Sequence, residues 1–246
     1  VIFCYYNPSL LYAMYGLVVG RVISFLISAI ICRDIILKSK LYFNVATCNR
    51  LISFGGWITV SNIISPIMAY FDRFIISHIM GASRIAFYTA PSEGVSRLIN
   101  IPYALARALF PKLAYSNNDD ERKKLQLQSY AIISIVCLPI VVIGVIFASF
   151  IMTTWMGPDY ALEAATIMKI LLAGFFFNSL AQIPYAYLQS IGKSKITAFV
   201  HLIELAPYLL LLYYFTMHFG IIGTAIAWSL RTFCDFVILL SISRRK

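Results

Sequence analysis

The sequence contains few charged residues. Asp, Glu, Lys and Arg make up 12% of its 246 residues, whereas a soluble domain contains about a quarter. Hydrophobic residues make up 61%, and the mean hydropathy is +0.82. Because one water-soluble core cannot hide this much apolar surface, the composition excludes an ordinary soluble domain and predicts a polytopic membrane protein.

The long apolar stretches lack strict alternation of apolar and polar residues, which argues against a β-barrel. Residues 125–158, for example, contain no charged side chain and are long enough to cross roughly 30 Å of hydrocarbon. Since backbone groups in lipid need internal hydrogen-bond partners, we expect an all-α polytopic membrane protein. The pattern predicts about seven transmembrane helices, at roughly 9–32, 55–80, 86–111, 129–155, 164–191, 197–217 and 221–243.

Motifs of catalytic and metal sites are missing. No Walker loop, HExxH, GxSxG or CxxC motif appears, and the expected loops are short. The five cysteines are scattered and odd in number, so we interpret them as small apolar fillers and not as a disulfide set or metal site. The sequence therefore predicts that the protein is not an enzyme and has no catalytic residue, metal or cofactor.

The net charge of +10 raises the possibility of nucleic-acid binding, but most of it lies in short segments beside the spans. Lys and Arg exceed Asp and Glu in segments 33–50, 112–128 and 192–196 and in the C-terminal tail. The positive-inside rule places these segments in the cytoplasm and predicts no nucleic-acid partner. Seven spans then put the N-terminal end outside, as expected if earlier helices of a longer protein precede it.

Charged side chains also occur inside the spans, where each costs about 2.5–3.5 kcal/mol at a helix centre. They are Arg21, Asp72, Arg73, Glu93, Arg97, Arg107, Lys169, His201, Glu204, Arg231 and Asp235. Polar residues recur at steps of three or four in five spans, which keeps them on one helix face. One example is Asn178, Gln182, Tyr185 and Gln189. Five such stripes predict a water-filled cavity between the helices.

An alternative is that these charges pair and fix the helix packing. Glu93 with Arg97 and Arg231 with Asp235 have the i,i+4 spacing of such pairs. Bases outnumber acids in the spans, and an excess of arginine suits an anionic ligand, especially a phosphate, which guanidinium binds with two hydrogen bonds. The sequence thus favours a path for an anionic ligand but leaves helix packing open.

Two further positions carry separate predictions. Asp72 falls close to the helix face of Ser61 and Asn62, so we expect it to face the polar interior in a structural role. We expect Arg73 to snorkel or to pair with a neighbouring helix. His201 lies near Glu204 and is a candidate protonation site, although a lone His is more often a packed residue.

Several segments, in order along the chain, are diagnostic of a family. They are FGGWITVSNIISPIMAYFDRFIISHIMG (54–81), FYTAPSEGVSRLINIPYALARALFPKL (87–113), WMGPDYALEAA (155–165), YLQSIGKSKITAFVHLIEL (187–205) and FGIIGTAIAWSLRTFCDF (219–236). From about residue 50 to the C-terminus, the chain resembles the O-antigen and polysaccharide flippases of the multidrug/oligosaccharidyl-lipid/polysaccharide exporter superfamily. The first span is compatible with this family but less diagnostic.

The resemblance implies a two-lobe transporter with six helices in each lobe around a central cavity. Residues 1–32 would be the last helix of a first lobe that is mostly missing, and residues 33–53 the cytoplasmic connection between lobes. Residues 54–246 would form the six-helix C-terminal lobe.

The implied function is movement of an undecaprenyl-pyrophosphate-linked O-antigen or polysaccharide repeat unit from the cytoplasmic to the periplasmic leaflet of the bacterial inner membrane. Implied partners are this lipid-linked oligosaccharide, membrane lipid, and a polysaccharide polymerase and chain-length regulator. The substrate-binding candidates are Arg21, Arg97, Arg107 and Arg231. The candidates for ion coupling or a structural polar role are Asp72, Glu93, His201, Glu204 and Asp235.

Three alternatives stay open at this point. A drug/cation antiporter of the same superfamily would need a cavity dominated by carboxylates and aromatics, which the excess of arginine opposes. A membrane-bound polysaccharide polymerase would need a large external loop or a catalytic His/Asp cluster. The third alternative is an inactive truncated fragment, in which a lone second lobe would expose unpaired charges to lipid.

Overall fold

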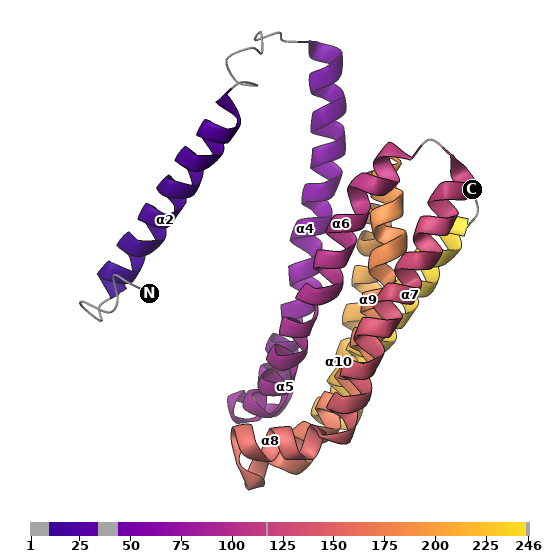
Figure 1. Ribbon diagram of the computed structural model, residues 1–246. Helices are drawn as coiled ribbons and strands as arrows, with labels where there is room; N and C mark the ends of the chain where they lie inside the picture. The colour runs from indigo at the N-terminus through magenta and orange to yellow at the C-terminus, as the bar shows by residue number, and fades with distance from the viewer. Residues whose placement is uncertain (1–9, 34–43, 117, 245–246) are drawn as a thin grey trace. The chain divides into compact units, whose positions relative to one another are not determined.

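The computed structural model describes residues 10–33, 44–116 and 118–244, and all regular structure in these ranges is helical (Figure 1). The elements are α2 (Leu10–Ile31), α4 (Val45–Met80), the short 3-10 helix η1 (Ala82–Arg84), α5 (Ile85–Leu98), α6 (Asn100–Tyr115), α7 (Asp119–Ile146), α8 (Ala148–Met156), α9 (Pro158–Ser190) and α10 (Ser194–Arg244). Five of them, α2, α4, α7, α9 and α10, are long and apolar enough to cross a membrane. The predicted all-α polytopic membrane protein is confirmed.

The chain divides into two compact units, residues 1–49 and residues 50–246. In the first unit, α2 exposes Arg21 and most of its apolar side chains. Residues 34–43, in the predicted connection 33–53, lie outside the described residues. The end of that connection is helical, because α4 begins at Val45 and continues into the second predicted span. The lobe boundaries themselves stay a prediction.

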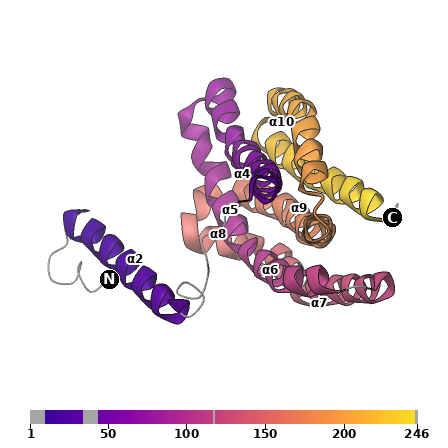
Figure 2. The same cartoon turned by 90° about the horizontal axis from the view of Figure 1, so that it is seen from above.

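In the second unit, α9 is the central helix and contacts α5, α6, α7, α8 and α10 (Figure 1 and Figure 2). Its fully buried side chains include Ile167, Leu172, Phe175, Ile183 and Leu188. The helix begins at Pro158, whose fixed φ suits a first helical position. These five helices therefore pack around α9.

The contact between α9 and α10 is close because Gly174 has no side chain. The hydroxyl of Ser229 donates to the carbonyl of Ile170 (2.8 Å), and that of Thr232 donates to the carbonyl of Gly174 (3.1 Å). A small residue and hydroxyl hydrogen bonds are the usual means by which helices associate in lipid, where the hydrophobic effect does not drive them together.

A sharp bend divides α10 into the two spans predicted at 197–217 and 221–243. Gly220 has φ 63° and ψ −147°, a backbone conformation essentially restricted to glycine. Across the bend, the hydroxyls of Thr216 and Thr224 form a buried hydrogen bond of 2.8 Å. The two halves are thus joined with almost no loop.

The third and fourth predicted spans each correspond to two helices. α5 and α6 are joined through Ile99, whose φ of −59° and ψ of −24° remain helical. Pro102 has no N–H to donate to the carbonyl of Leu98, which explains the interruption at this point. α7 begins at Asp119 and not near 129, because the side chain of Asn118 caps it by accepting from the Asp120 N–H (3.0 Å). α8 is a separate short helix after Phe147.

Several basic residues at helix ends of the second unit lie together at one end of the bundle. Figure 1 shows that α6 ends, α7 begins, α9 ends and α10 both begins and ends at this end. The bases here include Lys112, Arg122, Lys123, Lys124, Lys193, Lys195 and Arg244, accompanied by the acids Asp120 and Glu121. Successive spans connect alternately at this end and at the opposite end of the bundle, as the predicted topology requires. The assignment of this end to the cytoplasm stays a prediction.

Candidate substrate cavity

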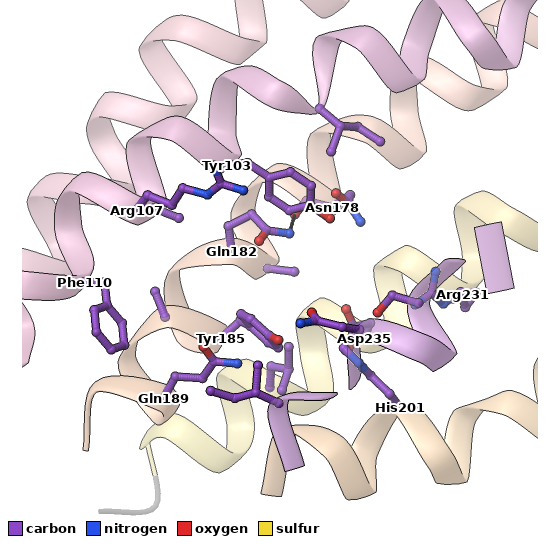
Figure 3. A pocket seen from close by; sticks show the side chains of 18 of the residues that line it. Tyr103, Arg107, Phe110, Asn178, Gln182, Tyr185, Gln189, His201, Arg231 and Asp235 are labelled. Carbon is purple, nitrogen blue, oxygen red and sulfur yellow. Dashed lines mark hydrogen bonds and ion pairs between the residues drawn. The ribbon is translucent and has the colours of Figure 1, made fainter. Parts of the chain in front are cut away.

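A cavity of about 540 Å³ lies within the second unit, between α4, α6, α9 and α10 (Figure 3). Its polar and aromatic lining residues are Asn62, Ser65, Tyr103, Arg107, Phe110, Asn178, Gln182, Tyr185, Gln189, His201, Trp228, Arg231 and Asp235. So many hydrogen-bonding groups around a space inside a membrane protein require water or a ligand as partner. The cavity is therefore the candidate functional site.

α9 contributes an unbroken polar stripe to the cavity. Asn178, Gln182, Tyr185 and Gln189 all belong to the lining, as their steps of four, three and four residues predict. The Gln182 amide donates to the Asn178 carbonyl (3.3 Å), while the Asn178 Oδ1 is buried without a hydrogen-bond partner among the described residues. Amides both donate and accept, so this face can bind a neutral polar group such as a sugar hydroxyl.

Two arginines reach the cavity from opposite walls. Figure 3 shows Arg107 on α6 near Tyr103, and Arg231 on α10 near Asp235. The Arg231 guanidinium lies 5.7 Å from the centre of the Tyr208 ring, and its Nε is buried without a hydrogen-bond partner among the described residues. Arg231 thus keeps donor capacity that a ligand in the cavity could use.

A cluster of titratable side chains lies where the two halves of α10 face each other. His201 Nε2 lies 3.8 Å from Asp235 Oδ1, and the His201 ring stacks on Tyr185 with a centroid distance of 5.8 Å. Glu204 is buried, and neither of its carboxylate oxygens has a hydrogen-bond partner within the described ranges. The cluster is structurally incomplete without a proton, water or ligand.

The structure brings four of the predicted site residues together and places the others elsewhere. Arg107, His201, Arg231 and Asp235 line the cavity, and Glu204 is buried beside it on α10. The remaining candidates lie outside the lining, namely Arg21, Asp72, Glu93 and Arg97. Arg21 belongs to the first unit, and Arg97 is exposed at the end of α5.

Asp72 and Arg73 link α4 to α5. The Tyr88 hydroxyl donates to Asp72 Oδ2 (2.6 Å), and Arg73 forms an ion pair with Glu93 (2.6 Å). Adjacent residues point about 100° apart on a helix, so each takes a separate partner. Asp72 is buried as predicted, but in a contact between helices and not in the cavity.

Comparison with known proteins decides the family. Residues 8–164 match the family of polysaccharide biosynthesis proteins. The chain belongs to this family. A protein of Shigella flexneri, whose name describes it provisionally as an O-antigen transporter, is 46% identical over 97% of this chain and 57% of its own length. An uncharacterized membrane protein of Methanocaldococcus jannaschii is 24% identical over 77% of this chain and 38% of its own length. No solved structure matches.

The resemblance to polysaccharide flippases is thus confirmed at the level of the family. This polysaccharide biosynthesis protein spans little more than half the length of the Shigella relative, 57%. Activity, substrate and partners of the whole protein are therefore matters for a proposal.

The two i,i+4 pairs that the sequence left open, Glu93 with Arg97 and Arg231 with Asp235, form no ion pair in the described part of this polysaccharide biosynthesis protein. Glu93 pairs with Arg73 on α4 and not with Arg97 on its own helix. Asp235 Oδ1 lies 3.8 Å from His201 Nε2, and the described residues show no ion pair within 4 Å between Asp235 and Arg231. Lys169, predicted to be a buried base, is exposed on α9. For both pairs, the packing of the helical segments, which the sequence does not give, decides the contact.

Sequence reasoning missed part of the α6 wall of the cavity. The residues that line the cavity here are Ile99, Tyr103, Ala106 and Phe110, about a quarter turn around the helix from the face of the charged candidates Glu93, Arg97 and Arg107. Of these charged candidates, Arg107 alone also lines the cavity. The signal was present as a second set of steps of four, three and four residues, but all four of its members are apolar or aromatic.

Proposed function

We propose that the protein takes part in moving a lipid-linked polysaccharide repeat unit across the membrane as a flippase. The observation that carries the proposal is the cavity of about 540 Å³, which combines amides, aromatic rings and two arginines inside an all-helical membrane protein. The family and the Shigella relative support the same class of substrate. We assign no catalytic step to any residue.

The lining suits a glycan attached to a phosphate. Asn178, Gln182 and Gln189 can exchange hydrogen bonds with sugar hydroxyls, and Tyr185 and Trp228 can pack against the apolar faces of sugar rings. Arg107 and Arg231 can bind phosphate oxygens. Among the lining residues, these two arginines outnumber the one carboxylate, Asp235, which favours an anionic ligand over the cation of a drug antiporter.

The transport step follows from the properties of the substrate. The polar sugars would cross in the wet cavity, while the polyprenyl tail stays in the bilayer and leaves through a gap between helices. Rocking of this unit against a second lobe would expose the site to one leaflet at a time. The proposed direction is from the cytoplasmic to the periplasmic leaflet, with undecaprenyl pyrophosphate as the lipid carrier.

The remaining charged candidates enter the proposal in different ways. Arg21 and Arg97 lie outside this cavity, and their role in binding substrate stays a prediction. His201, Glu204 and Asp235 are the candidates for ion coupling, because they form a buried cluster at the cavity. Asp72 and Glu93 have structural partners and are assigned to helix packing.

The test is complementation in bacteria that lack their own O-antigen flippase. The natural gene product that carries this sequence is expressed as wild type, Arg107→Ala, Arg231→Ala and the control Lys169→Ala, which removes an exposed base outside the lining. Surface glycan, lipid-linked precursor and protein abundance in the membrane are measured together.

We expect both cavity variants to lose surface glycan and accumulate precursor at normal abundance, while Lys169→Ala exports normally. Normal export in Arg107→Ala and Arg231→Ala would refute the role of this cavity. Absence of any complementation by the wild type, at normal abundance, would refute the proposed function itself.

A further inference from the structure

A second, smaller cavity of about 180 Å³ lies between α6 and α7, near the basic end of the bundle. It is separate from the candidate substrate cavity, with which it shares only Ala106. Its walls are mainly apolar and include Leu105, Ala108 and Ile132. We call it the α6–α7 groove.

Polar groups line the groove together with these apolar walls. Lys112, in the last turn of α6, and Gln128 on α7 both belong to the lining and are exposed. In the part of the chain that the structure describes, neither side chain has an ion pair or hydrogen bond. The nearby acids are engaged elsewhere, since Glu121 accepts from Ser116 (2.7 Å) and Asp120 lies 3.8 Å from Lys123.

The apolar side of the groove continues along the surface of α7. Ile132 is 49% exposed, Ile135 72% and Val142 48%, and all three lie on a helix apolar enough to cross the membrane. A lipid-facing apolar strip thus leads from the groove into the bilayer. The α6–α7 groove offers a cation and an amide near the membrane surface and a path for a hydrocarbon chain below them.

We propose that the α6–α7 groove binds one anionic phospholipid, with its phosphate at Lys112 and Gln128 and an acyl chain along Leu105, Ala108 and Ile132. Basic pockets between transmembrane helices bind anionic headgroups, and lysine binds phosphate as a point charge. The small side chain of Ala108 leaves the space that the acyl chain occupies. This inference needs only a membrane-embedded protein and does not depend on the proposed transport function.

Lipid binding to the purified natural gene product tests the proposal by native mass spectrometry. After delipidation, the protein is titrated with phosphatidylglycerol, with phosphatidylcholine, or with phosphatidylglycerol in the presence of inorganic phosphate. Lys112→Gln removes the cation, and Ala108→Phe fills the groove without changing charge. Lys124→Gln is the matched control, an exposed lysine near the same end of the bundle that is not part of the lining.

We expect one phosphatidylglycerol to bind at least about fivefold more tightly than phosphatidylcholine, as one lysine near an anionic headgroup predicts. Lys112→Gln should lose about this factor, Ala108→Phe should lose it or more, and Lys124→Gln should bind as the wild type does. Circular dichroism and gel filtration verify that each variant is folded.

Three results would overturn the assignment. Equal losses in Lys112→Gln and Lys124→Gln would mean a diffuse attraction of lipid to the basic end. Unchanged binding by folded Ala108→Phe would mean that no chain occupies the groove. Full displacement by inorganic phosphate would identify a site for a free anion and not for a lipid.

Discussion

The contact at Gly174 can be tested by adding a single methyl group. An alanine Cβ at this position would lie 2.6 Å from the Ser229 Oγ, 2.6 Å from the Trp228 ring and 2.9 Å from the Ser229 Cα. The side-chain atoms could move, but the Ser229 Cα belongs to the backbone of α10. Gly174→Ala therefore forces α9 and α10 apart.

The expected cost combines three effects. Overpacking of a tight interface costs about 1–3 kcal/mol, and the two hydrogen bonds from Ser229 and Thr232 to α9 contribute about 0.6 kcal/mol each. Replacing glycine by alanine inside a helix returns about 1 kcal/mol. The net destabilisation should be about 1–3 kcal/mol, which corresponds to a fall in unfolding temperature of roughly 3–9 °C for a unit of this size.

The assay is thermal unfolding of the purified protein in one detergent at one heating rate. Gly56→Ala is the matched control, because Gly56 also lies inside a helix, α4, but a Cβ there meets nothing within 4 Å. We expect Gly56→Ala to keep or raise the unfolding temperature, by up to about 1 kcal/mol of stability. Equal unfolding temperatures for Gly174→Ala and Gly56→Ala would refute the proposed close contact of α9 and α10.

Two further predictions concern the ends of the bundle. Tyr88→Phe removes the hydroxyl that donates to the buried carboxylate of Asp72. This change should lower the free energy of unfolding by about 1–3 kcal/mol, measured by thermal unfolding. An unchanged unfolding temperature would mean that the carboxylate finds another partner. Gly220→Ala places a side chain at a φ of 63°, and the backbone strain should lower the free energy of unfolding by about 1–3 kcal/mol. An unfolding temperature equal to that of the wild type in the same assay would contradict this prediction.

The spans could be predicted from the sequence because their signal is local. Apolar runs with few charges fix where a helix crosses, and the polar stripe of α9 required only helical periodicity, so Asn178 to Gln189 were placed on one face correctly. The bend at Gly220 followed equally from the gap between two apolar runs. No residue type marks the interruption at Phe147, where no proline or glycine stands.

Partners between helices could not be predicted, because they depend on how the helices pack. In the sequence, Glu93 is close to Arg97, at the i,i+4 spacing, and 20 residues from Arg73. It nevertheless pairs with Arg73 across α4 and α5. The α6 wall of the cavity was missed for a related reason. A lining made of Ile99, Tyr103 and Phe110 has the composition of a lipid-facing surface, and only the neighbouring helices show that it faces a cavity.

The central position of α9 has a consequence for biosynthesis. α5, α6, α7 and α8 are all synthesised before α9, yet α9 is the helix that each of them contacts. Domains fold from the N-terminus while the ribosome adds about 5–20 residues per second, so these helices must wait in the membrane for several seconds without their common partner. During that interval, the bundle around Arg107 and around the ion pair of Arg73 with Glu93 is not yet assembled, and contact of these charges with lipid is costly until α9 arrives.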